Sequence, residues 1–224
     1  MKKRWVIPPK QNGEFVARME NILELYALPY DPNIPLVCFD EKPYQLLGDK
    51  LKPIASKSDK VTCEHYEYVR KGTCSIFVFV QPLKGWRRIE ALERRTKKDF
   101  AHQIEKLLLK DFPDVKRVRL VTDNLNTHTI GSLYEAFPAH HARNLARRLE
   151  INYTPKRGSW LNIAEIEISA MQLQCINRRI PSIPELNEQL YAWQTDRNNA
   201  NKHVDWHLDV EDARGRLKHL YPEL

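Results

Sequence analysis

Val118-Arg119-Leu120-Val121-Thr122-Asp123 is a short, largely apolar run that ends in an acid. A second run with the same pattern, Leu36-Val37-Cys38-Phe39-Asp40, lies earlier in the chain. Short apolar runs bounded by polar residues are typical of buried strands. Ligand sites in sheets that are combined with helices collect where such strands end. The two runs therefore predict a sheet that carries Asp40 and Asp123 at one edge.

Antiparallel strands are expected between these two runs. Residues 75–80 are rich in β-branched and aromatic side chains, and residues 66–69 alternate loosely between polar and apolar. Lys71-Gly72 between them is interpreted as a hairpin turn, and residues 86–92 as a third strand. A helix over residues 96–109 follows, with Thr96 as its cap.

The rest of the chain predicts helices and one brief strand, at residues 151–153. Hairpins first and crossover units later imply an α/β fold whose mixed sheet has antiparallel strands first and parallel strands later. Helices are expected to pack on this sheet. Apolar residues at helical spacing predict these further helices at residues 14–28, 130–137, 139–149, 159–178, 184–198 and 210–220.

Basic side chains outnumber acidic ones, with 36 Lys and Arg against 29 Asp and Glu and a formal net charge of +7. A basic chain favours a polyanionic partner, because each Lys or Arg that meets a phosphate releases counterions. Arg147, Arg148, Lys156 and Arg157 are candidate DNA contacts. Each alone is better explained as part of a solvated surface, but together with other basic residues that flank the proposed acids in sequence they favour contacts with phosphate.

Several other classes of protein are disfavoured by the sequence. No run of 18 apolar residues is present, so no membrane span is expected. The first residues are basic but precede no apolar segment, so no signal peptide is expected and the chain is predicted to be cytoplasmic. No nucleotide or cofactor motif is present, which argues against an enzyme of small-molecule metabolism.

A third acid is expected from the helix predicted to begin near Ser159. Two magnesium ions about 4 Å apart can activate the attacking oxygen and stabilise the leaving oxygen in phosphodiester cleavage. Magnesium prefers oxygen ligands, and three carboxylates that meet without a cation would raise one another's pKa. Helical spacing does not choose between Glu165 and Glu167. An acid at a strand end is also explained as a cap, so spacing alone leaves the metal site open.

Longer segments around these acids resemble a known family. The segment from Val121 to His128 is similar to the Asp-Asn-x-x-x-His segment around the second catalytic acid of mariner-like DDE transposases. Tyr153 to Glu165 resembles the segment that carries their third acid, in the form typical of the bacterial insertion-sequence branch. There the acid is the third residue after a Leu-Asn pair, which selects Glu165. Phe39-Asp40-Glu41 resembles the first-acid segment.

The resemblance implies a ribonuclease-H-like fold, with helices on both faces of the sheet, and metal-dependent cleavage and joining of DNA. Asp40, Asp123 and Glu165 would be catalytic and would hold two Mg²⁺ or Mn²⁺ ions, with His128 in support. Asn162, three residues before Glu165 on the same helix face, is a supporting candidate from its position: it would orient that carboxylate or touch phosphate, and capping of the helix start explains it equally well. The implied partners are double-stranded DNA, both transposon ends and target, and a second copy in the active complex. The implied division is a lead-in with a linker helix at 1–34, a catalytic domain at 35–200 and a tail helix at 201–224.

Two departures from the family pattern stand out. Arg157 occupies a position where relatives usually carry His. Fewer than 40 residues precede Asp40, too few for the helix-turn-helix region of full-length relatives. The chain is therefore interpreted as a truncated remnant, or as a second reading frame that works with an upstream helix-turn-helix product at the bacterial nucleoid. A ribonuclease-H-like nuclease without transposition, and an inactive remnant that only binds DNA, are the alternatives.

Overall fold

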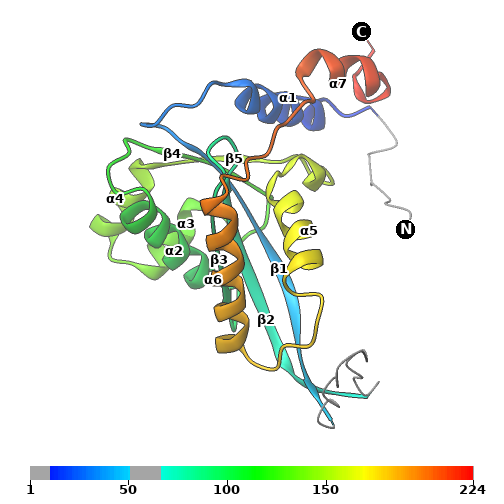
Figure 1. Ribbon diagram of the computed structural model, residues 1–224. Helices are drawn as coiled ribbons and strands as arrows, with labels where there is room; N and C mark the ends of the chain where they lie inside the picture. The colour runs from blue at the N-terminus through cyan, green and yellow to red at the C-terminus, as the bar shows by residue number, and fades with distance from the viewer. Residues whose placement is uncertain (1–10, 51–66, 224) are drawn as a thin grey trace.

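A five-stranded mixed sheet in the order β3-β2-β1-β4-β5 forms the centre of the molecule (Figure 1). The computed structural model describes residues 11–50 and 67–223. β1 pairs antiparallel with β2, and β2 with β3, whereas β1 and β4, and β4 and β5, pair in parallel. This confirms the expected order of antiparallel and then parallel strands. The strands are β1 (Leu36–Asp49), β2 (Tyr68–Gln81), β3 (Trp86–Leu92), β4 (Val118–Thr122) and β5 (Leu149–Tyr153).

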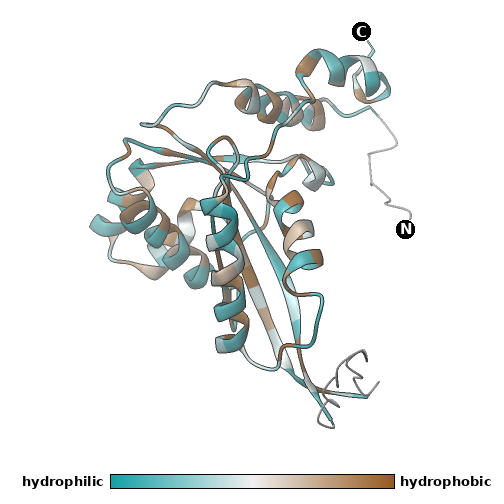
Figure 2. Cartoon of the chain, viewed as in Figure 1, coloured by the Kyte–Doolittle hydropathy of each residue, from teal (hydrophilic) through white to brown (hydrophobic). Residues whose placement is uncertain are grey.

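Seven α-helices pack on this sheet within the described ranges, and Figure 2 shows both hydrophilic and hydrophobic residues along them. None of these helices is long and apolar enough to cross a membrane. α1 and α7 lie side by side at one end of the molecule (Figure 1). The helices are α1 (Gly13–Ala27), α2 (Lys97–Lys106), α3 (Ile130–Ala136), α4 (Ala139–Arg147), α5 (Ala164–Gln174), α6 (Ile183–Asn199) and α7 (Val210–Arg216).

Strand alternation divides the hydrophobic core between the two faces of the sheet. On one face, Val37 and Phe39 of β1 pack with Phe100 and other side chains of α2, α3 and α4. On the other face, Leu36 and Cys38 pack with α1, with the start of α5 and with α7. α5 and α6 cover the β2–β3 part of that second face. Helices thus lie on both faces. The predicted division at residues 34 and 200 stays a prediction.

The predicted turn at Lys71-Gly72 is wrong, because β2 runs straight through it. Gly72 has a φ of +115°, which an L side chain rarely adopts. The strand tolerates this conformation because the β1–β2 register shifts at Leu46/Leu47, opposite this stretch, as at a β-bulge. β1 likewise extends to Asp49 rather than ending at Asp40, so the two strands form one long hairpin (Figure 1). The Lys- and Pro-rich composition of residues 50–60 predicts a linker there, and all of it except Lys50 lies outside the described residues.

The helix predicted over 159–178 is divided in the structure. A 3-10 turn, Ser159–Leu161, comes first, and α5 begins only at Ala164. Asn162 causes the break, because its extended backbone interrupts the helix and its side chain accepts a hydrogen bond from the Ala164 N–H at 3.1 Å. Other helices agree with the prediction to within a few residues, and the Thr96 cap of α2 is confirmed as a capping box.

Side chains of α6 cap the free edge of β3. Asn187 accepts a hydrogen bond from the Ala91 N–H at 2.7 Å and donates one to the Ala91 carbonyl at 3.0 Å. Asn198 makes the same pair of bonds with Arg87, both at 2.9 Å. An uncovered edge strand exposes backbone groups that can pair with another chain. α6 therefore completes the sheet as well as covering it.

We expect Asn187→Ala to lower the free energy of unfolding by about 1–3 kcal/mol, because the buried Ala91 peptide groups lose both partners. Urea denaturation measures this change. Glu188→Ala, an exposed change on the same helix, is the control and should stay within about 0.5 kcal/mol of the unaltered protein. Equal stability of the two variants would contradict the capping role.

Candidate active site

Asp40 lies where the parallel part of the sheet opens. Pairing between β1 and β4 ends at Cys38 and Val121, whereas β1 continues alongside β2. Strand alternation places Asp40 on the same face of β1 as Cys38, toward the start of α5. The Glu41 N–H donates to Asp40 Oδ1 at 2.7 Å. The prediction that β1 ends at Asp40 was thus wrong. Asp40 nevertheless lies beside the end of β4, where the acids were expected.

Burial raises the pKa of Asp40 to about 7. The hydrogen bond from the Glu41 N–H and the charge of His128 act in the opposite direction, whereas the negative charges of Asp123 and Glu165 raise the pKa further. Each of the other two predicted acids therefore acts electrostatically on the first. A cation beside these carboxylates would stabilise the charged form of Asp40.

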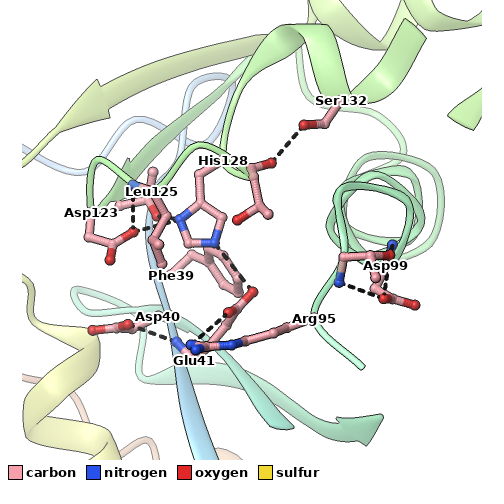
Figure 3. A network of polar contacts seen from close by, with 12 residues as sticks. Phe39, Asp40, Glu41, Arg95, Asp99, Asp123, Leu125, His128 and Ser132 are labelled. Atoms are coloured by element: carbon pink, nitrogen blue, oxygen red, sulfur yellow. Dashed lines mark hydrogen bonds and ion pairs between the residues drawn. The ribbon is translucent and has the colours of Figure 1, made fainter. Parts of the chain in front are cut away.

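Asp123 follows the last residue of β4 and is tied to His128 (Figure 3). Its Oδ1 lies 2.6 Å from His128 Nδ1 and 3.3 Å from the Leu125 N–H. The imidazole is fully buried and its ring centroid lies 5.0 Å from those of Phe39 and Phe100. Burial lowers its pKa, but hydrogen bonds and charges from Asp123 and Glu41 together raise it to about 9. A positively charged ring therefore holds the second acid.

Glu41 is a site residue that the sequence alone did not single out. It follows Asp40 and so points to the opposite face of β1. Its side chain is 2% exposed, and its Oε1 lies 3.3 Å from His128 Nε2 (Figure 3). The signal in the sequence was only its place in the Phe39-Asp40-Glu41 segment, because nothing local indicates that His128 lies against it.

Glu165 and Glu167, which helical spacing left open, have different surroundings. The Glu167 side chain is fully buried, and its Oε1 lies 2.8 Å from Nε of both Arg87 and Arg197. Glu165 is partly exposed at the start of α5, and its charge acts on Asp40. The carboxylate of Glu167 is therefore neutralised by two arginines in the core, whereas that of Glu165 belongs with Asp40 and Asp123, which are called the acidic group below.

Asn162 links α5 to the first acid rather than to Glu165. Its side-chain amide donates to the Phe39 carbonyl at 2.8 Å and lies 3.5 Å from Asp40 Oδ2. Its own carbonyl oxygen accepts from Ala164. The side chain is fully buried, so both of the roles considered from the sequence, capping a helix start and orienting a carboxylate, fall on this one residue, with Asp40 as the carboxylate.

The four predicted DNA contacts lie at opposite ends of β5. Lys156 and Arg157 are exposed and follow β5, at the same edge as Asp123. Arg157 has a φ of +65°, so this exposed turn is held in an unfavourable conformation. Arg147 and Arg148 precede β5, about 17 Å away along a five-residue strand. Arg148 Nη2 donates to three carbonyl oxygens, those of Phe112, Pro113 and Val115, which uses much of its hydrogen-bonding capacity.

The residues at this edge fit a divalent cation by their chemistry. Asp40, Asp123 and Glu165 supply oxygen ligands of the kind that magnesium and manganese prefer. Over the described residues, no group of three or more His, Cys, Asp or Glu side chains is already arranged to hold a metal ion. Asp123 Oδ1 is engaged by His128. The three acids are thus neighbours rather than a preformed cage.

The raised pKa of Asp40 predicts how the metal-free chain responds to pH. Its folded pKa, about 7, lies above the ordinary value of 3.8, so stability present below pH 4 is lost as the pH rises through 7. Asp40→Asn removes this loss. We expect the variant to match the unaltered chain at pH 4 and to exceed its free energy of unfolding at pH 8 by up to about 4 kcal/mol. Denaturant titrations with a chelator measure this, and equal stability at pH 8 would mean that Asp40 is solvated.

Residues 35–187 match the family model described as DDE superfamily endonuclease. No curated protein matches the chain. The crystal structure of the Mos1 mariner paired end complex with Mn has a TM-score of 0.58 at 16% identity, over 90% of this chain and 61% of that chain. The Mos1 strand transfer complex has a TM-score of 0.58 at 15% identity, over the same shares. The complex with Mg has a TM-score of 0.56 at 16% identity, over 100% of this chain and 68% of that chain.

These structures confirm the expected ribonuclease-H-like arrangement, a mixed sheet with helices on both of its faces. At such low identity the likeness concerns the fold alone. The chain spans 61% of the length of the Mos1 chain in the paired end complex with Mn.

Proposed function

Because the chain belongs to the DDE superfamily of endonucleases, we propose that it is the catalytic part of a transposase. It would cleave DNA at the ends of an element and join those ends to target DNA. The observation that carries this proposal is the position of Asp40 where the pairing of β1 with β4 ends, with Asp123 held by His128 just after β4; burial and the charges of Asp123 and Glu165 raise the pKa of Asp40 to about 7. Strongly shifted carboxylates at one edge of a sheet are typical of catalytic sites.

Two bound Mg²⁺ or Mn²⁺ ions would activate the attacking oxygen and stabilise the leaving oxygen. The chain itself would supply positions. Asn162 holds the backbone of β1 next to Asp40, and His128 holds Asp123. Lys156 and Arg157, exposed at the same edge, would contact the phosphates on either side of the cleaved bond. Alignment of a phosphodiester in this way supplies much of the catalysis in phosphoryl transfer.

The wider assembly is also part of this proposal. The Mos1 structures are described as paired end and strand transfer complexes, which supports transposon ends and target DNA as partners here. A homodimer would bring two such sites to one pair of ends. A separate helix-turn-helix product is a further proposed partner, which would recognise the element's ends. We further propose a bacterial insertion sequence as the element, acting at the nucleoid in the cytoplasm.

Replacement of the second acid tests the chemistry. We expect Asp123→Asn to reduce Mg²⁺- or Mn²⁺-dependent nicking of supercoiled DNA by at least about a hundredfold, while the affinity for DNA changes little, because the amide weakens cation binding but leaves the basic surface intact. Gel assays of nicking and of DNA binding measure the two effects. Equal nicking by the variant would remove Asp123 from the site.

Glu167→Gln is the control, because it likewise removes one carboxylate, but one that is paired with Arg87 and Arg197 and lies outside the acidic group. It should lower stability, since Arg87 and Arg197 lose their buried partner, but folded protein should keep its nicking activity. Strand transfer with pre-cleaved element ends then separates the proposal from its alternatives. Nicking without joining would indicate a nuclease, and binding without either would indicate an inactive remnant.

The basic turn after β5 yields a separate prediction. We expect Lys156→Gln combined with Arg157→Gln to weaken DNA binding, and to reduce the slope of log affinity against log salt by about 2, because each lost phosphate contact removes about 0.9 from the slope. Fluorescence anisotropy at several salt concentrations measures this. Arg147→Gln, at the opposite edge, should change the slope less. An unaltered slope for the double variant would exclude the turn from the DNA path.

A further inference from the structure

Glu41 is buried on the face of β1 opposite to Asp40, and its burial has no evident benefit for stability. A carboxylate that is 2% exposed carries a large desolvation cost unless it is fully paired. Within the described residues, its Oε2 forms no hydrogen bond and has only Arg95 Nη1 nearby, at 3.9 Å. An apolar side chain would satisfy the packing at lower cost. The reason for the acid must therefore lie in what its other oxygen contacts.

That contact is His128, whose ring uses its two nitrogens in opposite directions (Figure 3). Nε2 faces Glu41 Oε1 at 3.3 Å, and Nδ1 faces Asp123 Oδ1 at 2.6 Å and Thr122 Oγ1 at 3.1 Å. Tyr153 also holds the backbone here, with its hydroxyl donating to the His128 carbonyl at 2.7 Å. A carboxylate that accepts from Nε2 restricts the χ2 rotation of the imidazole ring, and so the direction in which Nδ1 points.

Asp123 needs such a constraint more than the other two acids do. It lies on the loop after β4 rather than inside a strand or helix, and its side chain is 31% exposed. Within the described part of the chain, the hydrogen bonds of this carboxylate to His128 and Leu125 both use Oδ1, and Oδ2 forms none. The pairing with His128 therefore leaves one oxygen of Asp123 available to a cation.

We propose that Glu41 is a positioning residue, which sets the orientation of His128 and through it that of the Asp123 carboxylate. This inference rests on the proposed function, because its purpose is to align one of the three metal-holding acids. Glu41 itself contacts neither DNA nor metal in this role. It acts from the opposite face of the same strand that carries Asp40, so β1 would help to place two of the acids.

Two variants of the full chain test this role without any reaction. Glu41→Gln keeps the shape of the side chain, and Glu41→Met keeps its volume without a polar group and should fold if packing alone matters. In the metal-free chain we expect both to shift the carboxyl ¹³C resonance of Asp123. Glu90→Gln is the matched control, because Glu41, Phe77 and Glu90 form one cross-strand row and Glu90 pairs with Lys106 instead. It should leave that resonance in place.

Metal affinity provides the second measurement. We expect Glu41→Gln to weaken Mn²⁺ binding about tenfold by calorimetry, and Glu90→Gln to leave it as in the unaltered chain. Glu41→Gln added to His128→Asn should weaken it no further than His128→Asn alone, because the two residues act in series.

Additive effects of the two changes, or an Asp123 resonance that Glu41→Gln and Glu41→Met both leave in place, would overturn the role of Glu41. If the unaltered chain neither binds Mn²⁺ nor nicks DNA, the proposed function fails, and the comparison of resonances in the metal-free chain still decides whether Glu41 positions Asp123.

Discussion

The candidate site depends on the point at which β4 stops pairing with β1. The two strands separate after Cys38 and Val121, and β1 continues as half of a hairpin with β2. A gap opens in the parallel part of the sheet just where Asp40 and Asp123 follow the last paired residues. Asn162 then joins the start of α5 to the Phe39 carbonyl, which brings the third acid to the same edge. One local end of pairing thus organises residues from three distant segments.

Buried charge is treated in two ways in this chain. Away from the candidate site, buried charged side chains form ion pairs. Glu167 pairs with Arg87 and Arg197, and Arg88 pairs with Asp111 at 2.5 Å. At the candidate site, the negative charges of Asp123 and Glu165 raise the pKa of Asp40, and the charge of His128 lowers it. Pairing offsets much of the desolvation cost of a buried charge, whereas like charges held together store unfavourable energy that a cation relieves. This contrast distinguishes the acids that support the fold from those that would carry the chemistry.

Much of the fold could be predicted from local pattern. Local composition and spacing predict most helices and the strands at 86–92 and 118–122, because helix and strand patterns depend on residues that are close together in the sequence. Lys71-Gly72 was misinterpreted because a glycine suited to a turn is equally suited to a β-bulge, and only pairing with β1 decides between them. The break at Asn162 was missed for a related reason, since its amide bonds to a carbonyl 123 positions away in the sequence.

The sequence by itself determined that Asp40 and Asp123 follow short apolar runs, that the chain is basic, and that the family resemblance selects Glu165. Only the tertiary structure decided that Glu167 is neutralised by Arg87 and Arg197, that Asn162 serves Asp40, and that Glu41 lies against His128. The physical reason is that strand and helix periodicity state which way a side chain points but not what it meets. The partner comes from another segment, and packing of the whole chain brings the two together.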